Sequence, residues 1–192
     1  MKIYLIGYMC CGKTTIGKKI ANKIGYGFVD MDVLFEEKYK ITISAFFEKY
    51  GQDAFRILEQ KLLHTTASMD NMVIATGGGT PCFGDNMEWI NANGLSIYLK
   101  TNEGFIVDRL KKAKKQRPLV KNILPDDLPS YVAEAIKQRE PYYSQATITM
   151  PNNEMDLSSI IAEIAPLSAI SLWECLDFLT ETYVIGGSEL MM

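Results

Sequence analysis

Residues 7–15, GYMCCGKTT, have the composition and spacing of a phosphate-binding loop, Gly7-x4-Gly12-Lys13-Thr14. In such a loop the glycines let backbone N–H groups turn inward around a phosphate, the lysine reaches the terminal phosphates, and the threonine hydroxyl binds Mg²⁺. The stretch therefore predicts a site for MgATP. The residues predicted to bind ATP in it are Cys10, Cys11, Gly12, Lys13, Thr14 and Thr15.

The loop pattern also has an ordinary alternative, a strand-to-helix turn with a lysine in the first helical turn. The context favours the phosphate loop, because an apolar run at 2–7 predicts a buried strand directly before it and residues 13–24 have helical spacing directly after it. A phosphate loop alone does not distinguish water, a protein or a small molecule as the phosphate acceptor. Other residues have to decide the substrate.

Two carboxylates, Asp30 and Asp32, follow in FVDMD at the end of a predicted strand. If the strand continues through both, the period of two places them on the same side, at the sheet edge where ligands bind in parallel sheets. One carboxylate is then expected near Mg²⁺, and the other holds or deprotonates an acceptor hydroxyl. The alternative is structural, with Asp32 capping a helix that begins at about residue 34.

Three further features are compatible with a small acidic acceptor. Arg56 is expected at a helix start in GQDAFRILE, the glycines of TGGGT (76–80) allow close approach to backbone N–H groups, and Arg139 is expected at a helix end before a proline. Each also has a purely structural interpretation. Arg56 could form a surface ion pair with Glu59, the glycines could form a flexible turn, and Arg139 could stabilise a helix C-terminus.

The remaining pattern indicates alternating strands and helices. Strands are expected at 2–7, 27–32, from 72 to the glycines of 75–80, at 95–100 and at 146–150. Helical spacing occurs at 13–24, 34–39, 43–50, 55–68, 85–92, 102–115, 127–139 and 157–165. Such alternation predicts an α/β protein with a parallel sheet covered on both faces.

The whole chain, 1–192, is expected to form a single domain, because no repeat or linker divides it. Residues 111–127, KKAKKQRPLVKNILPDD, are rich in cations and contain two prolines, so they predict a mobile insertion rather than a continuous helix. The stretch from about 166 to 192 predicts a short amphipathic helix that packs on its own domain. A dimer contact through this extension is the alternative to a monomer.

The composition bounds the partners and the location. With 47% hydrophobic residues, a net charge of -3 and a pI near 5.3, the chain is not expected to bind nucleic acid. No apolar run is long enough for a membrane span, so we expect a cytoplasmic protein. The four cysteines, Cys10, Cys11, Cys82 and Cys175, match no metal-binding spacing, and the single His64 does not complete a zinc site with them. The cysteines are therefore expected to be free thiols.

Taken together, the motifs resemble those of the shikimate kinase family. Their order is phosphate loop, D-x-D, F-R, GGG, an R-P-L segment and R-x-P-x-Y, and it extends from residue 2 to about 150. The resemblance implies a P-loop kinase fold, a three-layer α/β/α sandwich with a five-stranded parallel sheet, a mobile lid and a C-terminal helical extension. It also implies transfer of the γ-phosphoryl group of ATP to the 3-hydroxyl of shikimate, a step of aromatic amino-acid biosynthesis by way of chorismate.

The resemblance further implies residue roles. Asp32 would bind the shikimate hydroxyls and act as base, Thr14 and Asp30 would face Mg²⁺, and Lys13 would act at the phosphates. The residues implied to bind shikimate are Asp32, Arg56, Gly77, Gly78, Gly79 and Arg139. Arg117, in the lid segment 111–127, matches the arginine that closes over the phosphates, and Arg109 matches one near the adenine.

Two departures from the family pattern concern the ATP site. Cys10 replaces a usual glycine, so its backbone has to adopt a conformation open to a residue with a side chain, and PNNEMD (151–156) lacks a usual basic residue. A thiol beside a lysine at a helix start is also expected to be open to oxidation or alkylation. Two other functions remain open: a related small-molecule kinase, acting on gluconate or a nucleoside monophosphate, and a non-catalytic ATP-binding regulatory module.

Overall fold

The computed structural model describes residues 1–113, 120, 123–151, 158, 160–162 and 164. The chain divides into two compact units, residues 1–155 and 156–192, and everything below concerns the first. Arg117, much of the expected lid and the expected C-terminal extension lie outside the described residues, as does most of the segment PNNEMD.

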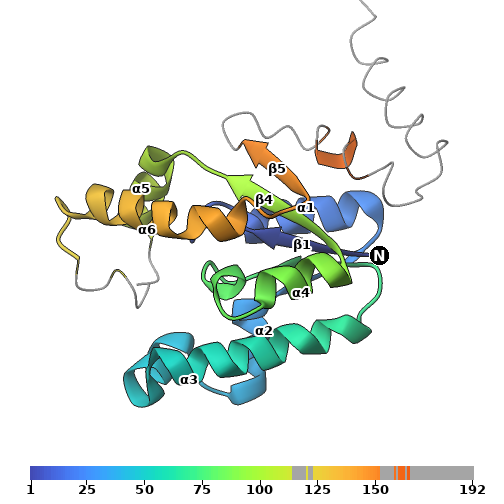
Figure 1. The fold of residues 1–192 in the computed structure, drawn as a ribbon, viewed down its shortest axis with the longest axis horizontal. Helices are drawn as coiled ribbons and strands as arrows, with labels where there is room; N and C mark the ends of the chain where they lie inside the picture. Colours follow the sequence, from blue (N-terminus) through green and yellow to red (C-terminus); the bar gives the residue numbers. More distant parts are fainter. Residues whose placement is uncertain (114–119, 121–122, 152–157, 159, 163, 165–192) are drawn as a thin grey trace, which may run out of the picture. The chain divides into compact units, whose positions relative to one another are not determined.

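A five-stranded parallel sheet forms the centre of the first unit (Figure 1), as the sequence predicts. Its order is β2-β3-β1-β4-β5. The strands are β1 (Lys2–Ile6), β2 (Gly27–Asp30), β3 (Met72–Ala75), β4 (Leu95–Lys100) and β5 (Ile148–Pro151). Because Asp30 pairs with Ala75 and Leu5 pairs with both Ala75 and Ile97, the strands end at one common edge. Loops that follow β1, β2 and β3 are therefore brought together.

Six α-helices accompany the sheet in the described part of the chain. They are α1 (Lys13–Ile24), α2 (Met31–Tyr39), α3 (Ile43–Thr65), α4 (Asn86–Asn93), α5 (Glu103–Lys112) and α6 (Leu128–Tyr143), with 3-10 turns at Thr66–Ser68 and Thr80–Cys82. None of the helices in these residues is long and apolar enough to cross a membrane.

The two faces of β1 pack against different helices, which makes the three layers. Tyr4 and Ile6 belong to a core cluster that also contains residues of α2, α3, α4 and α6. Leu5 points the other way, and its side chain lies 3.0 Å from where a Cβ on Gly17 of α1 would be. All four residues from Ile3 to Ile6 are completely buried. This is the expected pattern for a central parallel strand, which is apolar on both sides.

The break expected between the helices at 43–50 and 55–68 is confirmed, because α3 has non-helical backbone dihedrals at Gly51 and is kinked there. Two other expectations about the elements are wrong. The strand β2 ends at Asp30, and α2 begins at Met31, so Asp32 lies in the first turn of a helix; Asp30, not Asp32, caps it. Helix α6 does not end near residue 139 but continues to Tyr143 with Pro141 inside it. Arg139 is therefore held within a helix rather than at its end.

Substitution of Gly51 tests the kink in α3. A Cβ at Gly51 would meet nothing within 4 Å, so any cost arises from the backbone, whose φ of 80° and ψ of 173° suit glycine almost exclusively. We expect Gly51→Ala to lower the free energy of unfolding in urea by about 1–3 kcal/mol. Gly25→Asn is the matched control, because Gly25 also has open space but a φ of 70° and ψ of 25°, which asparagine tolerates. Equal losses in both variants would contradict the backbone explanation.

Candidate active site

A cavity of about 520 Å³ lies at the carboxyl ends of β1, β2 and β3. It brings together nearly all the predicted site residues that the structure describes. Those that line it are Cys10, Gly12, Lys13, Thr14, Thr15, Asp30, Asp32, Arg56, Gly77, Gly78, Gly79, Arg109 and Arg139. The exception is Cys11, whose side chain is buried beneath the loop. Arg117 cannot be placed, because it lies outside the described residues.

The loop between β1 and α1 fixes the ammonium group of Lys13. Its Nζ donates to the carbonyl oxygens of Gly7 at 2.7 Å and Tyr8 at 2.9 Å. The sulfur of Cys11, a weak acceptor, lies 3.6 Å away. An ammonium group has three protons, so two carbonyls hold it in place while the third proton is bound only weakly and can turn to a phosphate oxygen. Lys13 is thus positioned by the loop it serves.

Cys10 has a backbone conformation that favours glycine. Its φ is 61°, in the left-handed region, where a side chain costs roughly 1–2 kcal/mol. A residue with a side chain can adopt this conformation, as the sequence argument requires, but only at that cost in free energy. The side chain is half-buried and lines the cavity. The guanidinium group of Arg109 lies beside Cys10. Its Nη1 donates to the Cys10 carbonyl oxygen at 3.1 Å, and the group stacks on the ring of Phe105.

Thr14 and Asp30 meet directly, although they belong to different elements. The Thr14 hydroxyl donates to Asp30 Oδ2 at 2.6 Å, and the other carboxylate oxygen accepts from the backbone N–H of Asp32 at 3.0 Å. A hydroxyl and a carboxylate are hard oxygen ligands of the kind Mg²⁺ takes, usually with the rest of its shell from water and phosphates. No cluster of three His, Cys, Asp or Glu side chains suited to a metal exists among the described residues. Thr14 and Asp30 thus offer two oxygen groups of the kind that Mg²⁺ takes as ligands.

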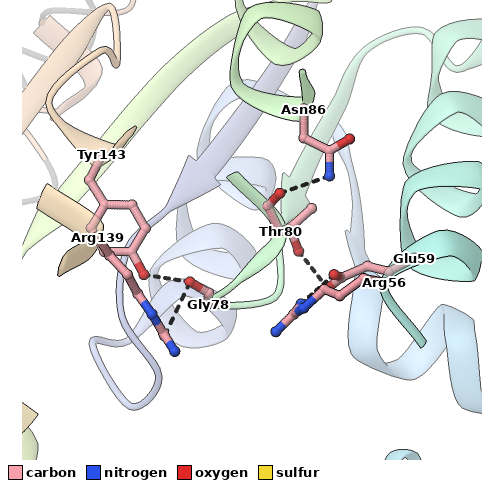
Figure 2. Close-up of polar contacts among 7 residues, drawn as sticks. All are labelled: Arg56, Glu59, Gly78, Thr80, Asn86, Arg139 and Tyr143. Atoms are coloured by element: carbon pink, nitrogen blue, oxygen red, sulfur yellow. Dashed lines mark hydrogen bonds and ion pairs between the residues drawn. The ribbon is translucent and has the colours of Figure 1, made fainter. Parts of the chain in front are cut away.

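Arg56 is held in a buried network rather than on the surface (Figure 2). Its Nη1 forms an ion pair with Glu59 Oε2, and both side chains are less than a tenth exposed. The other oxygen of Glu59 accepts from the Thr80 hydroxyl at 2.6 Å, and Asn86 donates to the Thr80 carbonyl at 2.8 Å. Burial raises the pKa of Glu59, while the charge of Arg56 and the Thr80 hydrogen bond oppose this rise. The pairing with Glu59 was anticipated as a structural alternative, but its burial was not.

The glycine loop packs so tightly that side chains are excluded. A Cβ on Gly79 would lie 2.2 Å from Arg56 Nη2, and one on Gly77 would lie 2.5 Å from Glu59 Oε1. A Cβ on Gly78 would lie 3.0 Å from the backbone nitrogen of Met9 in the phosphate loop. None of these glycines has a positive φ. They are therefore needed for close packing against Arg56, Glu59 and the phosphate loop, and the close approach of a ligand stays a prediction.

Arg139 reaches the opposite side of the glycine loop. Its Nη1 lies 3.5 Å from the Gly78 carbonyl oxygen, and its guanidinium lies over the Tyr8 ring, 4.9 Å from the centroid. In the view of Figure 2 the two arginines flank the loop, with both guanidinium groups extending to the same side of it. Burial raises the pKa of Tyr8 to about 12 despite the charge of Arg139, so the ring meets the cation as a neutral phenol. Two cations and a row of backbone groups thus surround one part of the cavity.

Sequence reasoning missed several contacts of the site. Thr80 binds Glu59, Tyr8 supports Arg139, and Tyr143 donates to the Gly78 carbonyl oxygen. Tyr143 belongs to the R-x-P-x-Y motif, but the motif gave it no contact. These contacts join residues tens of positions apart, which no local pattern reveals.

Comparison with known proteins decides the family. A sequence model described as shikimate kinase matches residues 9–167. The chain is 38% identical over 164 residues to the shikimate kinase of Parabacteroides distasonis, covering 85% of this chain and 95% of that protein. It is 41% identical over 155 residues to that of Phocaeicola vulgatus, covering 81% and 89%. The chain belongs to the shikimate kinase family.

Solved structures agree with this membership. The crystal structure of the shikimate kinase from Bacteroides thetaiotaomicron matches with a TM-score of 0.80 and 36% identity, over 88% of this chain and 99% of that one. The Acinetobacter baumannii shikimate kinase, solved in complex with shikimate, matches with a TM-score of 0.78 and 31% identity, over 89% and 94%. A gluconokinase from Sinorhizobium meliloti reaches 0.53 at 15% identity, over 96% and 97%, a similarity of fold alone.

Gly79→Ala tests the close packing in this member of the shikimate kinase family. The added methyl group would displace the Arg56 guanidinium, which its buried bond to Glu59 holds in place. We expect acceptor-dependent ADP release to fall at least roughly tenfold, because a charge-assisted hydrogen bond is lost. Binding of a fluorescent ATP analogue should be unchanged. Gly25→Asn serves as control. Loss of nucleotide binding in Gly79→Ala would contradict the expectation that Arg56 and Gly79 serve the acceptor and not the nucleotide.

Alkylation tests the exposure of Cys10. Iodoacetamide should modify Cys10 but not the buried Cys11, and burial raises the pKa of the Cys82 thiol to about 11, which makes it a poor competitor. We expect modification to block ATP binding and ATP to slow the modification, as followed by peptide mass mapping. Cys10→Gly, which suits the left-handed backbone, should keep activity and resist the reagent. Inactivation of Cys10→Gly at the wild-type rate would disprove the assignment.

Proposed function

We propose that this cavity binds MgATP and shikimate together and transfers the γ-phosphoryl group of ATP to the 3-hydroxyl of shikimate. The observation that carries the proposal is the placement of Lys13, Asp32, Arg56 and Arg139 around one cavity. Lys13 belongs to a phosphate loop, and the two arginines lie on either side of the glycine loop. An anionic nucleotide and an anionic acceptor would therefore meet beside a carboxylate.

Each group has a part in the proposed transfer. Lys13 neutralises the phosphates. The Thr14 hydroxyl would bind Mg²⁺ and Asp30 would face its water shell, and the metal would supply further charge neutralisation when bound. Asp32 accepts the proton of the attacking hydroxyl. Its position supports this role, because its Oδ1 lies 3.3 Å from where a Cβ on Gly77 would be, and so beside the glycine loop.

The two arginines and an apolar wall support a cyclic carboxylic acid as acceptor. A guanidinium group matches a planar carboxylate in two hydrogen bonds, which an ammonium group does not. Beside the arginines the cavity is lined by Val33, Phe47 and Phe55. Such a wall suits the carbons of a ring better than the open, hydroxylated chain of gluconate. The solved relative from Acinetobacter baumannii, which contains shikimate, supports the same choice.

The proposal keeps several expectations from the sequence. Arg117 closes over the phosphates, Arg109 lies beside the adenine, and the protein acts in the cytoplasm as a monomer, without nucleic acid or membrane. The position of Arg109 at the phosphate loop supports its role. We also keep the expectation of a single kinase domain over 1–192.

An assay of ADP release tests the proposed substrate. Purified protein with MgATP should release ADP rapidly when shikimate is added, and far more slowly with gluconate or a nucleoside monophosphate. Asp32→Asn should lower the rate at least roughly a hundredfold, because the general base is removed, and should leave ATP binding unchanged. Asp53→Asn, the same substitution at an exposed site on α3, is the control. ATP binding without turnover on any acceptor would favour the non-catalytic module.

A further inference from the structure

Tyr143, the last residue of α6, is completely buried and has no part in the transfer described above. Its hydroxyl donates a hydrogen bond to the carbonyl oxygen of Gly78 in the middle of the glycine loop (Figure 2). Its ring packs against Tyr98 of β4, with the ring centroids 5.1 Å apart. A completely buried phenol thus binds the carbonyl oxygen of Gly78, and both chain neighbours of Gly78 are also glycines.

We propose that Tyr143 is a positioning residue for the acceptor. Through the Gly78 carbonyl it holds the peptide groups of the glycine loop so that the N–H groups of Gly78 and Gly79 donate to the carboxylate of shikimate between Arg56 and Arg139. This inference rests on the proposed function and names a determinant of its acceptor site.

Peptide geometry connects the hydroxyl to the N–H groups. In a trans peptide the C=O and N–H bonds point in opposite directions, so a Gly78 carbonyl directed at α6 turns the N–H of Gly79 away from α6. The preceding peptide is fixed similarly, because the backbone N–H of Thr80 donates to the Gly77 carbonyl at 3.2 Å. Within the described part of the chain neither Gly78 N–H nor Gly79 N–H donates to a protein acceptor, and both residues line the cavity. Two adjacent donors of this kind form an anion site.

Glycine makes the anchor necessary. Without side chains, residues 77–79 have little intrinsic preference for one backbone conformation, so contacts from outside have to select it. The Gly78 carbonyl has one other donor, Arg139, at 3.5 Å, which is a long hydrogen bond. If the Tyr143 hydroxyl were absent, either the peptide would rotate or Arg139 would move toward the carbonyl. Both changes take a donor away from the acceptor.

The hydroxyl is also a dependable donor. Burial raises the pKa of Tyr143 well above its usual range, although the nearby charge of Arg139 opposes the rise. The group therefore keeps its proton throughout the pH range in which the protein would act. Unlike a lysine or a carboxylate in the same place, it adds no charge that would compete with the acceptor.

Tyr143→Phe removes this single hydroxyl and keeps the ring. We expect the KM for shikimate to rise roughly three- to tenfold, as for the loss of one hydrogen bond. The KM for ATP and the kcat should stay within about twofold, since the phosphate loop is untouched. The matched control is Tyr4→Phe, which also loses one buried hydroxyl, bonded to Thr66 at 2.9 Å and not part of the cavity. It should leave both KM values unchanged.

A second measurement does not depend on how well the variant folds. In wild-type protein labelled with ¹⁵N, shikimate should shift the amide resonance of Gly78 or Gly79, and the shift should be reduced in Tyr143→Phe. No shift at either glycine in the wild type would overturn the proposal. So would an unchanged KM for shikimate in Tyr143→Phe, or equal rises in both KM values, which would indicate general damage.

The wild-type assay separates this proposal from the proposed function. If shikimate causes no ADP release, the function assigned above fails, and the acceptor role of Tyr143 fails with it. If shikimate is phosphorylated normally and Tyr143→Phe behaves like Tyr4→Phe, the positioning role alone is wrong.

Discussion

The site depends on the close approach of a glycine loop to a buried arginine. With a Cβ on Gly79 only 2.2 Å from Arg56 Nη2, the loop and the guanidinium group cannot both keep their places unless residue 79 is glycine. Gly78 also packs closely against the phosphate loop, where a Cβ on it would lie 3.0 Å from the backbone nitrogen of Met9. The acceptor side and the nucleotide side are therefore in direct backbone contact, which brings the two proposed substrates within reach of each other.

Such a loop needs support on both sides, because three consecutive glycines do not hold a conformation alone. On one side Glu59 and Asn86 bind Thr80, and on the other Tyr143 binds Gly78. The first support includes a buried ion pair, which contributes little to stability because both ions lose their hydration. Its value lies in fixing Arg56. The ion pair therefore stabilises the fold little, but it keeps the Arg56 cation at one place in the cavity.

The sequence predicted those features that depend on local pattern. The helix at 13–24 agrees with α1 at both ends, since a phosphate loop precedes it and Gly25 follows it. The strand and the carboxylates at 28–32 were harder, because alternation of apolar and acidic residues suits both a strand end and a capped helix start. Asp30 capping α2 decided for the helix. Likewise Pro141 suggested that α6 ends at Arg139, whereas the helix continues for four residues. Contacts such as that of Tyr143 with Gly78 depend on the tertiary fold and left no local signal.

The paired cysteines of the phosphate loop divide between surface and interior. Cys11 is buried, and its sulfur lies beside Lys13, so it belongs to the packing that holds the ammonium group. Cys10 has the left-handed backbone that glycine adopts without cost, and its side chain lines the cavity instead of filling the core. A side chain at residue 10 therefore costs the loop the left-handed backbone of a non-glycine residue. At Gly79 the backbone, with a φ of -101°, would accept a side chain, but the added Cβ would displace the Arg56 guanidinium group. This difference explains why the chain accepts a side chain at residue 10 of the nucleotide site but has none at residue 79 of the acceptor site.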